Sequence, residues 1–430
     1  MKKNFLSLFV FVILVLFGIM DGSVLLAANS TIVSPTKAIS ITANKLPTSV
    51  VRESYTQLSK KSDFVIQQYN FGDEPAYYHG VSLGEKTWPL FFSSEDFMKA
   101  FGSEGYSNFK LIHVFHNGTW LADAYKPDDD TGTFFLVTFL GNGKIQFDPL
   151  WNYPSSRYMY KFYVSPSEDA IYFQFEHGDS RSLSTLFRYD MKKRKAEKIV
   201  DFKQSEYILG LKNKTTLVVL AFESSSGCRY GTIEEIDVVR KKISVKRRVS
   251  EISGNSVCNK QGKSSHMAFW SQEGYIVRES VYDKQKHESH TRLIAYNLFS
   301  QRLGILGEYT DSFDGKEYHT TDTYIGGEIK WKDKYIYFVQ GGDSKSGKLF
   351  RFSVSSPRKS EFLGDLKCVV SQCLIQEATI TEKGLMYLDE SSNKDKNDGY
   401  YWFDFNKKTS EKFMTLPYGS PWYIEFLPIR

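Results

Sequence analysis

The 430 residues contain few of the patterns that identify an enzyme. They have no Gly-x-Ser-x-Gly nucleophile elbow, no His-Glu-x-x-His zinc motif, no Cys-x-x-Cys pair and no glycine-rich phosphate loop. The acidic stretches at 128–132 and 393–399 do not have the complete spacing of a calcium loop. The sequence therefore predicts no metal site and no cofactor, and it favours a non-enzymatic role while leaving catalysis open.

Neither positive nor negative charge is in large excess. The formal net charge is +5, with 55 Lys and Arg against 50 Asp and Glu. Proteins that bind nucleic acid usually show a strong basic excess, so this balance argues against nucleic acid as a partner. Aromatic residues, in contrast, make up 16% of the chain, which excludes a disordered protein and favours strands.

Only one long apolar run is present, and it lies at the N-terminus. Met1-Lys2-Lys3 supplies a positive start, the run extends over 5–20, and Ala27 and Ala28 end it with small residues. This layout predicts a signal peptide over 1–28, with an uncleaved anchor as the alternative. The mature protein, 29–430, is then a single exported domain in the periplasm or outside the cell, with no membrane span after signal removal.

Cysteines are scarce as well, numbering four. Four cysteines allow three pairings, and an exported protein meets an oxidising compartment. We expect Cys228 to pair with Cys258 and Cys368 with Cys373, because each pair would then join neighbouring connections on one face of the fold described below. Free buried thiols are the alternative.

A short pattern recurs along the chain instead. It consists of an apolar residue, two further residues, a mostly aromatic residue, a small polar residue and an apolar residue, and copies occur at 66–71, 134–139, 186–191, 233–238, 293–298, 349–354 and 400–405. The polar position recurs at intervals of 47 to 68 residues, as Asn70, Thr138, Asp190, Asp237, Asn297, Ser353 and Asp404. Repeats of this length with strand-like segments between them are typical of β-propeller blades.

Each copy is expected to form strand c of a four-stranded antiparallel unit, a to d. The polar side chain would bond its own backbone and begin the c–d turn, and the apolar positions would pack between neighbouring sheets. Seven copies predict an all-β, seven-bladed β-propeller, with six blades as the alternative. The chain ends in a lone strand at 422–426, which we expect to pair with the N-terminal blade and close the ring. A short helix is expected at 94–102.

One unit of the repeat resembles a known family. Ser165-Pro166-Ser167-Glu168, the strand 170–173 and the copy at 186–191 resemble the TolB and Tricorn type of propeller repeat, which has a Ser-Pro-Asp-Gly turn before its first strand. The Asp-Gly of that turn is replaced by Ser167-Glu168 here, and the other units keep only the second half. The resemblance covers most of the mature chain and implies a fold rather than an activity.

The order of strands sorts the connections onto two faces. The c–d turns are basic at 192–195, 240–242 and 407–408, whereas the b–c loops lean acidic. A basic c–d turn face could contact an anionic partner; solvated turn charge is the alternative. His113 and His116 lie on an expected inner strand with opposite orientations, and His266 lies near another, so a shared metal in the central channel is not favoured.

The longest d–a connection is expected from Gly307 to Gly327. It mixes aromatic residues with carboxylates on the loop side of a rigid scaffold, which is typical of a recognition site. The candidate binding residues are Tyr309, Asp311, Asp314, Tyr318, His319, Asp322 and Tyr324. A structural crossover over the channel mouth is the alternative.

Two functions compete. The first is an exported, non-catalytic binding or scaffold protein that recognises another protein or an envelope component. The second is a propeller hydrolase or lyase with carboxylates or a metal in the central channel. Three or more converging His, Asp or Glu side chains on the inner strands would favour the enzyme, and an apolar or lysine-filled channel would favour the binding protein.

Overall fold

The structure of the chain is a computed structural model. The described residues are 38–42, 44–45, 64–71, 74–82, 90–102, 105–106, 108–126, 131–140, 143–153, 159–176, 184–202, 206–225, 228–251, 263–313, 318–320, 325–340, 346–356, 360–367, 373–380, 382–389, 399–415 and 422–428. The predicted signal peptide, 1–28, lies outside them. No helix in these ranges is both long and apolar enough to span a bilayer.

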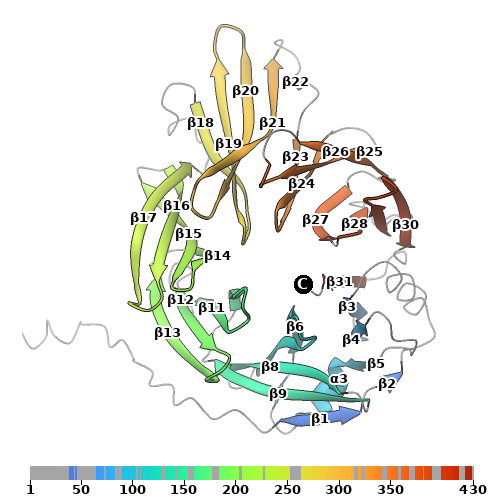
Figure 1. The fold of residues 1–430 in the computed structure, drawn as a ribbon. Helices are drawn as coiled ribbons and strands as arrows, with labels where there is room; N and C mark the ends of the chain where they lie inside the picture. The colour runs from blue at the N-terminus through green and yellow to red at the C-terminus, as the bar shows by residue number, and fades with distance from the viewer. Residues whose placement is uncertain are drawn as a thin grey trace, which may run out of the picture.

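The described strands form a β-propeller. Antiparallel meanders stand around a central axis, with the first strand of each near the axis and the last at the rim (Figure 1). In four of the six sheets the strand order follows the order along the chain, because short turns join consecutive strands, and the other two sheets include added strands from distant parts of the chain. This confirms the all-β propeller class.

Three sheets come from the N-terminal half and the chain end. The first comprises β2 (Asn44–Lys45), β5 (Leu90–Ser93), β4 (Glu74–Ser82), β3 (Phe64–Phe71) and β31 (Trp422–Pro428). The second comprises β1 (Ile39–Thr42), β9 (Lys144–Tyr153), β8 (Thr131–Leu140), β7 (Trp120–Lys126) and β6 (Asn108–Val114). The third comprises β10 (Met159–Val164), β11 (Ala170–Glu176), β12 (Ser184–Asp190) and β13 (Lys195–Phe202).

Three more sheets complete the ring. The largest has nine strands: β14 (Glu206–Asn213), β15 (Thr216–Ser225), β16 (Cys228–Asp237), β17 (Lys242–Glu251), β18 (Lys263–Trp270), β19 (Gly274–Asp283), β20 (Glu288–Asn297), β21 (Arg302–Phe313) and β22 (Tyr318–Thr320). The others are β23 (Ile325–Lys332), β24 (Tyr335–Gln340), β25 (Ser346–Ser353) and β26 (Glu361–Lys367), and β27 (Cys373–Ile380), β28 (Gly384–Asp389), β29 (Gly399–Asp404) and β30 (Thr409–Thr415).

The described strands make six hydrogen-bonded sheets, so the prediction of seven separate blades is not confirmed and the alternative of six agrees with the structure. The difference arises in the nine-stranded sheet. A single parallel pair, Glu251 opposite His266, joins the meander β14–β17 to the meander β18–β21. Leu209 and Ile233 of the first meander nevertheless pack against Met267 and Tyr275 of the second in one buried cluster. A repeat counted along the sequence does not reveal such a fusion.

The last strand closes the ring as expected. β31 pairs antiparallel with β3 over seven positions, from Val65 opposite Pro428 to Phe71 opposite Trp422. This makes β31 the innermost strand of its sheet and β3 the second. The copy of the pattern at 66–71 therefore lies on strand b, and the prediction that it forms strand c is wrong. The other six copies lie on third strands.

The polar position of the pattern begins the c–d turn, as predicted. The Asp237 carboxylate accepts the backbone N–H groups of Val239 and Arg240 at 3.0 and 2.8 Å. Asp404 accepts those of Asn406 and Lys407 at 2.9 and 3.0 Å. Asn297 and Asp190 bond their own turns in the same way. A short oxygen-bearing side chain thus satisfies turn donors that the strand ladder leaves unpaired.

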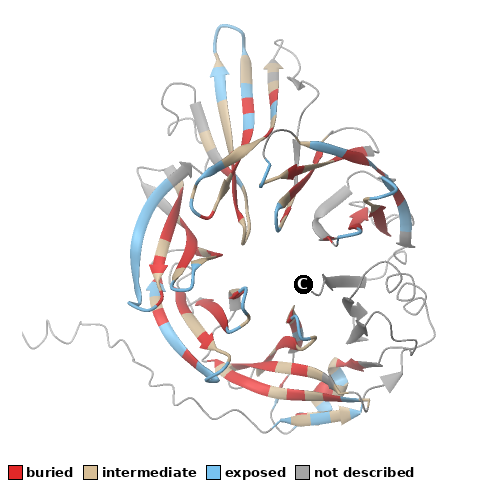
Figure 2. Ribbon diagram, viewed as in Figure 1, coloured by how far each residue is buried: buried red, intermediate tan, exposed pale blue. Residues whose placement is uncertain are grey.

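The core lies between neighbouring sheets, where both faces of most strands are buried (Figure 2). On β8, Phe134 packs toward the sheet that contains Phe173, and Phe135 packs toward β5 and the helix α3 (Ser94–Ala100). Phe134 and Phe173 stack at 4.2 Å between ring centroids. Because side chains alternate along a strand, each blade contributes to two interfaces, which explains the aromatic content of the repeat.

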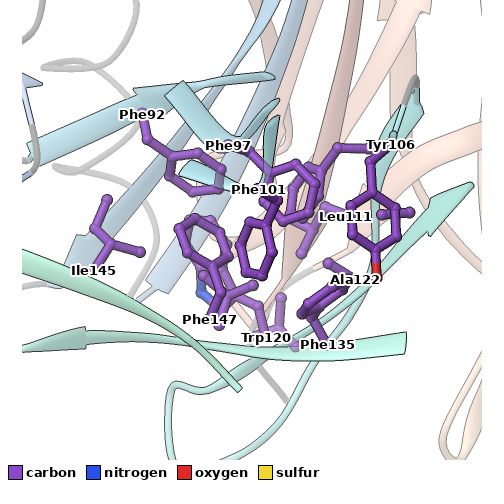
Figure 3. Packing of buried hydrophobic residues seen from close by; sticks show 14 residues of the cluster. Phe92, Phe97, Phe101, Tyr106, Leu111, Trp120, Ala122, Phe135, Ile145 and Phe147 are labelled. Carbon is purple, nitrogen blue, oxygen red and sulfur yellow. The ribbon is translucent and has the colours of Figure 1, made fainter. Parts of the chain in front are cut away.

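Helix α3 confirms the expected short helix. Ser93 caps it by accepting the backbone N–H of Asp96 at 3.1 Å, and Asp96 accepts the backbone N–H of Ser93 at 2.8 Å. Phe97 lies 5.2 Å from Phe147 and 5.3 Å from Phe135 between ring centroids (Figure 3). The helix therefore fills the space between two sheets, and it lies in the longest interval of the repeat.

Candidate functional site

One part of the ring departs from the common blade. Strands β19, β20 and β21 continue outward past the rim and form a projecting sheet, to which β22 is added (Figure 1). The outer part of their register runs from Ser280 opposite Thr291 to Asp283 opposite Glu288 at the tip. We call residues 278–292 together with 308–313 and 318–320 the projecting sheet.

Polar side-chain pairs between neighbouring strands stabilise the projecting sheet. They take the role that packing against a neighbouring sheet has in the ring. Ser280 and Thr291 share a hydroxyl hydrogen bond at 2.8 Å, and the Arg292 guanidinium donates to Glu279 at 3.1 Å. The ring of His290 contacts the Thr310 hydroxyl at 2.9 Å through Nδ1. These cross-strand contacts give the element a defined shape.

Apolar side chains are nevertheless exposed near the tip. Val281 and Tyr282 are 40% and 44% exposed, although both belong to residue types that strands usually bury (Figure 2). The Tyr282 hydroxyl contacts Nδ1 of His287 at 3.2 Å. An exposed aromatic residue beside charged and polar groups is the composition that protein interfaces use.

The predicted connection from Gly307 to Gly327 is partly strand, so the prediction of a continuous loop is wrong. Tyr309 and Asp311 lie on β21, and Tyr318 and His319 lie on β22. Tyr309 is buried and lies opposite Thr291. Asp314, Asp322 and Tyr324 lie outside the described residues, as do the side chains of Asp311, Tyr318 and His319. Sequence reasoning also missed Val281 and Tyr282, although the uninterrupted strand pattern over 274–283 is a signal for them.

The inner strands do not bring their histidines together in the described part of the chain. His116 lies in the turn after β6, and its Nδ1 contacts the Glu168 carboxylate of the next sheet at 2.7 Å. The His113 ring instead packs against Phe115 and Phe162. The side chain of His266 lies outside the described residues. Among the side chains that are described, no group of three His, Cys, Asp or Glu could hold a metal ion.

Aromatic and lysine side chains occupy part of the inner strands instead. The Lys161 ammonium of β10 lies over the ring of Tyr207, the second residue of β14. Tyr207 contacts Trp270 of β18 and Phe222 of β15 at 5.2 and 5.1 Å between ring centroids. These aromatic side chains pack against the buried cluster that contains Leu209 and Met267, between neighbouring meanders.

One buried ionisable pair lies between two sheets. The Tyr153 hydroxyl of β9 donates to the Asp123 carboxylate of β7 at 2.9 Å. Gly132 of β8 lies beneath the Tyr153 ring, and a Cβ there would collide with that ring. Burial raises the pKa of Asp123 to about 6, while the Tyr153 hydrogen bond and the Lys110 charge oppose the rise. The carboxyl therefore titrates near pH 6.

The basic c–d turns are partly neutralised within the fold. The Arg194 guanidinium makes two hydrogen bonds to the Asp148 carboxylate of the preceding sheet, at 2.8 and 3.0 Å. Lys241 likewise lies 3.4 Å from Glu197 of the preceding sheet. These pairs join the rim of neighbouring sheets, while Lys192 and Lys195 remain exposed. The turn face is therefore less cationic than its sequence indicates.

The predicted disulfides lie on cysteines whose side chains are outside the described residues. Cys228 begins β16 and Cys373 begins β27, while Cys258 and Cys368 fall in the connections before β18 and β27. The strand order puts all four in b–c or d–a connections or at their borders, as expected, and the pairing stays a prediction.

No family model matches the chain, and no curated protein matches it. Solved structures that resemble it include an uncharacterized protein from Listeria monocytogenes, at 12% identity and a TM-score of 0.48, with 87% of this chain and 95% of that chain covered. An oligogalacturonate lyase from Vibrio parahaemolyticus follows at 8% identity and a TM-score of 0.42, with 83% and 86% covered.

An acylaminoacyl peptidase from Pyrococcus horikoshii is also similar, at 12% identity and a TM-score of 0.34; the match covers 70% of this chain but only 50% of the peptidase. The resemblance expected from the repeat holds at the level of the propeller fold, and a likeness to TolB specifically is not shown. At such identities they carry no activity to this chain, and the propeller assignment rests on its own strand order.

Proposed function

We propose that this protein is an exported, non-catalytic β-propeller that binds another protein or an envelope component through the projecting sheet. The observation that carries the proposal is the outward extension of β19–β21, which exposes Val281 and Tyr282 beyond the rim. The ring packs through other residues of these strands, such as Ile276 and Leu293, so the outer part is not needed to fill the core. Exposed apolar groups on a rigid element favour recognition.

Export is the second part of the proposal and follows from the segment 1–28. Cell fractionation should find the protein outside the cytoplasm, and mass spectrometry of the mature form should find a chain that begins at residue 29. A full-length protein retained in the cytoplasmic fraction would contradict export without touching the binding proposal.

Site-specific crosslinking tests the binding surface. A photoreactive amino acid replaces Tyr282 in one variant and Phe362 in the control, since Phe362 is similarly exposed but lies on β26. After irradiation in intact cells, the Tyr282 variant should form one discrete crosslinked product that the Phe362 variant does not form. Identical products from both variants, or none from either, would overturn the assignment of the projecting sheet.

The alternative function, a propeller hydrolase or lyase, depends on residues around the channel that the described side chains do not assemble. Elemental analysis of the purified protein distinguishes the two. A stoichiometric metal that is lost on substitution of His266 or His113 would favour the enzyme.

A further inference from the structure

Strand β17 is exposed to an extent that the other outer strands are not. The described residues 241–248 are exposed throughout, including Ile243 and Val245 at 41% and 43%. The outer strands β9, β13 and β26 instead each bury several residues, among them Ile145, Phe147, Ala196, Ile199, Phe202, Leu363 and Leu366. Over 241–248 the rim of the nine-stranded sheet therefore presents exposed side chains on both faces of the strand.

The backbone edge of β17 is also open over most of its length. On one side the strand pairs with β16 from Asp237 opposite Lys242 to Tyr230 opposite Glu251. On the other side, among the described strands, its one pair is Glu251 with His266 of β18. An edge of this kind presents N–H and C=O groups that can template another strand.

This fold accepts added strands at its rim. The four-residue strand β1, which lies near the N-terminus, pairs antiparallel with the outer strand β9. The pairing runs from Ile39 opposite Phe147 to Thr42 opposite Lys144. β2 is added in the same way to the outer strand β5. Two other sheets are thus already extended from outside the four-stranded unit, and among the described strands none is added in this way to the ten-residue strand β17.

The side chains of β17 define what could be added. Basic groups, Lys242, Lys246, Arg247 and Arg248, are interspersed with Ile243 and Val245. The turn before the strand adds the exposed Val239, and Arg247 hydrogen-bonds Ser300, which brings the exposed Phe299 to the same rim. A complementary strand would place carboxylates opposite the basic groups and apolar residues opposite the apolar ones.

We propose that β17 binds an extended segment of a partner protein in which acidic and apolar residues alternate, by adding it as a further strand to the nine-stranded sheet. A second copy of this chain fits less well, because two β17 strands would bring basic side chains against each other. This surface is separate from the projecting sheet and does not depend on the function proposed for that element.

A peptide titration tests the proposal. The probe is a fluorescent ten-residue peptide of alternating Glu and Val, and its controls are a Lys–Val peptide and a Glu–Val peptide with alternate amides N-methylated. Fluorescence anisotropy with the full-length protein should show saturable binding of the first peptide alone. Double charge reversal, Lys242→Glu with Arg247→Glu, should weaken it at least about tenfold, because two attractive cross-strand pairs become repulsive.

The matched control is Lys195→Glu, since Lys195 is exposed and begins the outer strand β13 of the neighbouring sheet. It should leave peptide affinity unchanged, and circular dichroism confirms that every variant is folded. No binding of the Glu–Val peptide, equal binding of the N-methylated peptide, or equal weakening by Lys195→Glu would each overturn strand addition at β17. Self-association that the double reversal abolishes would overturn the choice of partner.

Discussion

The buried carboxyl of Asp123 makes the stability of the ring depend on pH in a direction that can be worked out. Asp123 lies between two sheets, its side chain accepts a hydrogen bond from Tyr153, and burial raises its pKa from the ordinary value of about 4 to about 6. The folded protein therefore holds this proton more tightly than the unfolded chain does. Asp123→Asn keeps the shape and an acceptor for Tyr153 but removes the charge.

The sign follows from linkage. A folded-state pKa that is raised gives stability that is fully present below about pH 4 and is lost as the pH rises through about 6. A difference of about two between the folded and unfolded pKa values corresponds to about 3 kcal/mol, because each pKa unit is worth about 1.4 kcal/mol. We therefore expect Asp123→Asn to stabilise the protein above pH 7 by up to about 3 kcal/mol, and to change it little at pH 4.

Urea denaturation between pH 4 and pH 8, followed by tryptophan fluorescence, measures the difference between variant and wild type. The control is Asp283→Asn, since backbone N–H groups of Lys286 and Gln285 lower the pKa of Asp283, so its charge should help rather than harm. Lys110→Gln should raise the pKa of Asp123 further, because the Lys110 charge lowers it. A stability difference for Asp123→Asn that is the same at every pH would refute the reasoning.

Three further changes test the packing and closure of the ring. Phe134→Ala should cost about 3–5 kcal/mol in the free energy of unfolding, because it empties a buried ring site that stacks on Phe173; thermal denaturation measures this, and a loss below about 1 kcal/mol would contradict it. Asp404→Ala removes the acceptor of two turn hydrogen bonds and should cost about 1–2 kcal/mol, with a smaller loss for Asp404→Asn, as urea denaturation can compare. Truncation before Trp422 removes the strand that pairs with β3 and should abolish cooperative unfolding, and an unchanged calorimetric transition would show that the ring does not need closure.

The repeat predicted the local structure well because local chemistry decides it. An Asp or Asn at the end of strand c finds turn N–H donors two and three residues later, whatever the rest of the fold does. The lone strand at 422–426 was expected to pair with the N-terminal blade, and β31 does pair with β3 of that blade. The cap of α3 follows from Ser93 and Asp96 alone.

Long-range arrangement could not be predicted in the same way. The copy at 66–71 looks like the others, but β31 supplies one strand before it rather than two, so β3 is strand b. Tyr309 and Asp311 were expected in a loop because polar residues surround them, yet the neighbouring strand β20 extends far enough to pair with them. The two meanders are joined through one pair of residues, Glu251 and His266, and neither residue type predicts such a pairing.

The lengths of the intervals between copies of the repeat indicate more about the proposed function than the repeated residues do. The residues of the pattern are occupied with packing, since both faces of a strand such as β8 lie between sheets. The proposed recognition therefore falls to elements that depart from the common blade, and departures lengthen the interval between copies. The longest interval, 68 residues, contains α3, whose buried residue Phe97 packs in the core. The next, 60 residues between Asp237 and Asn297, contains β17 and the outward part of β19 and β20, whose exposed side chains the core does not use. Strand β17 and the β19–β20 part of the projecting sheet thus belong to one long interval, while β21 and β22 of the projecting sheet follow it in the next.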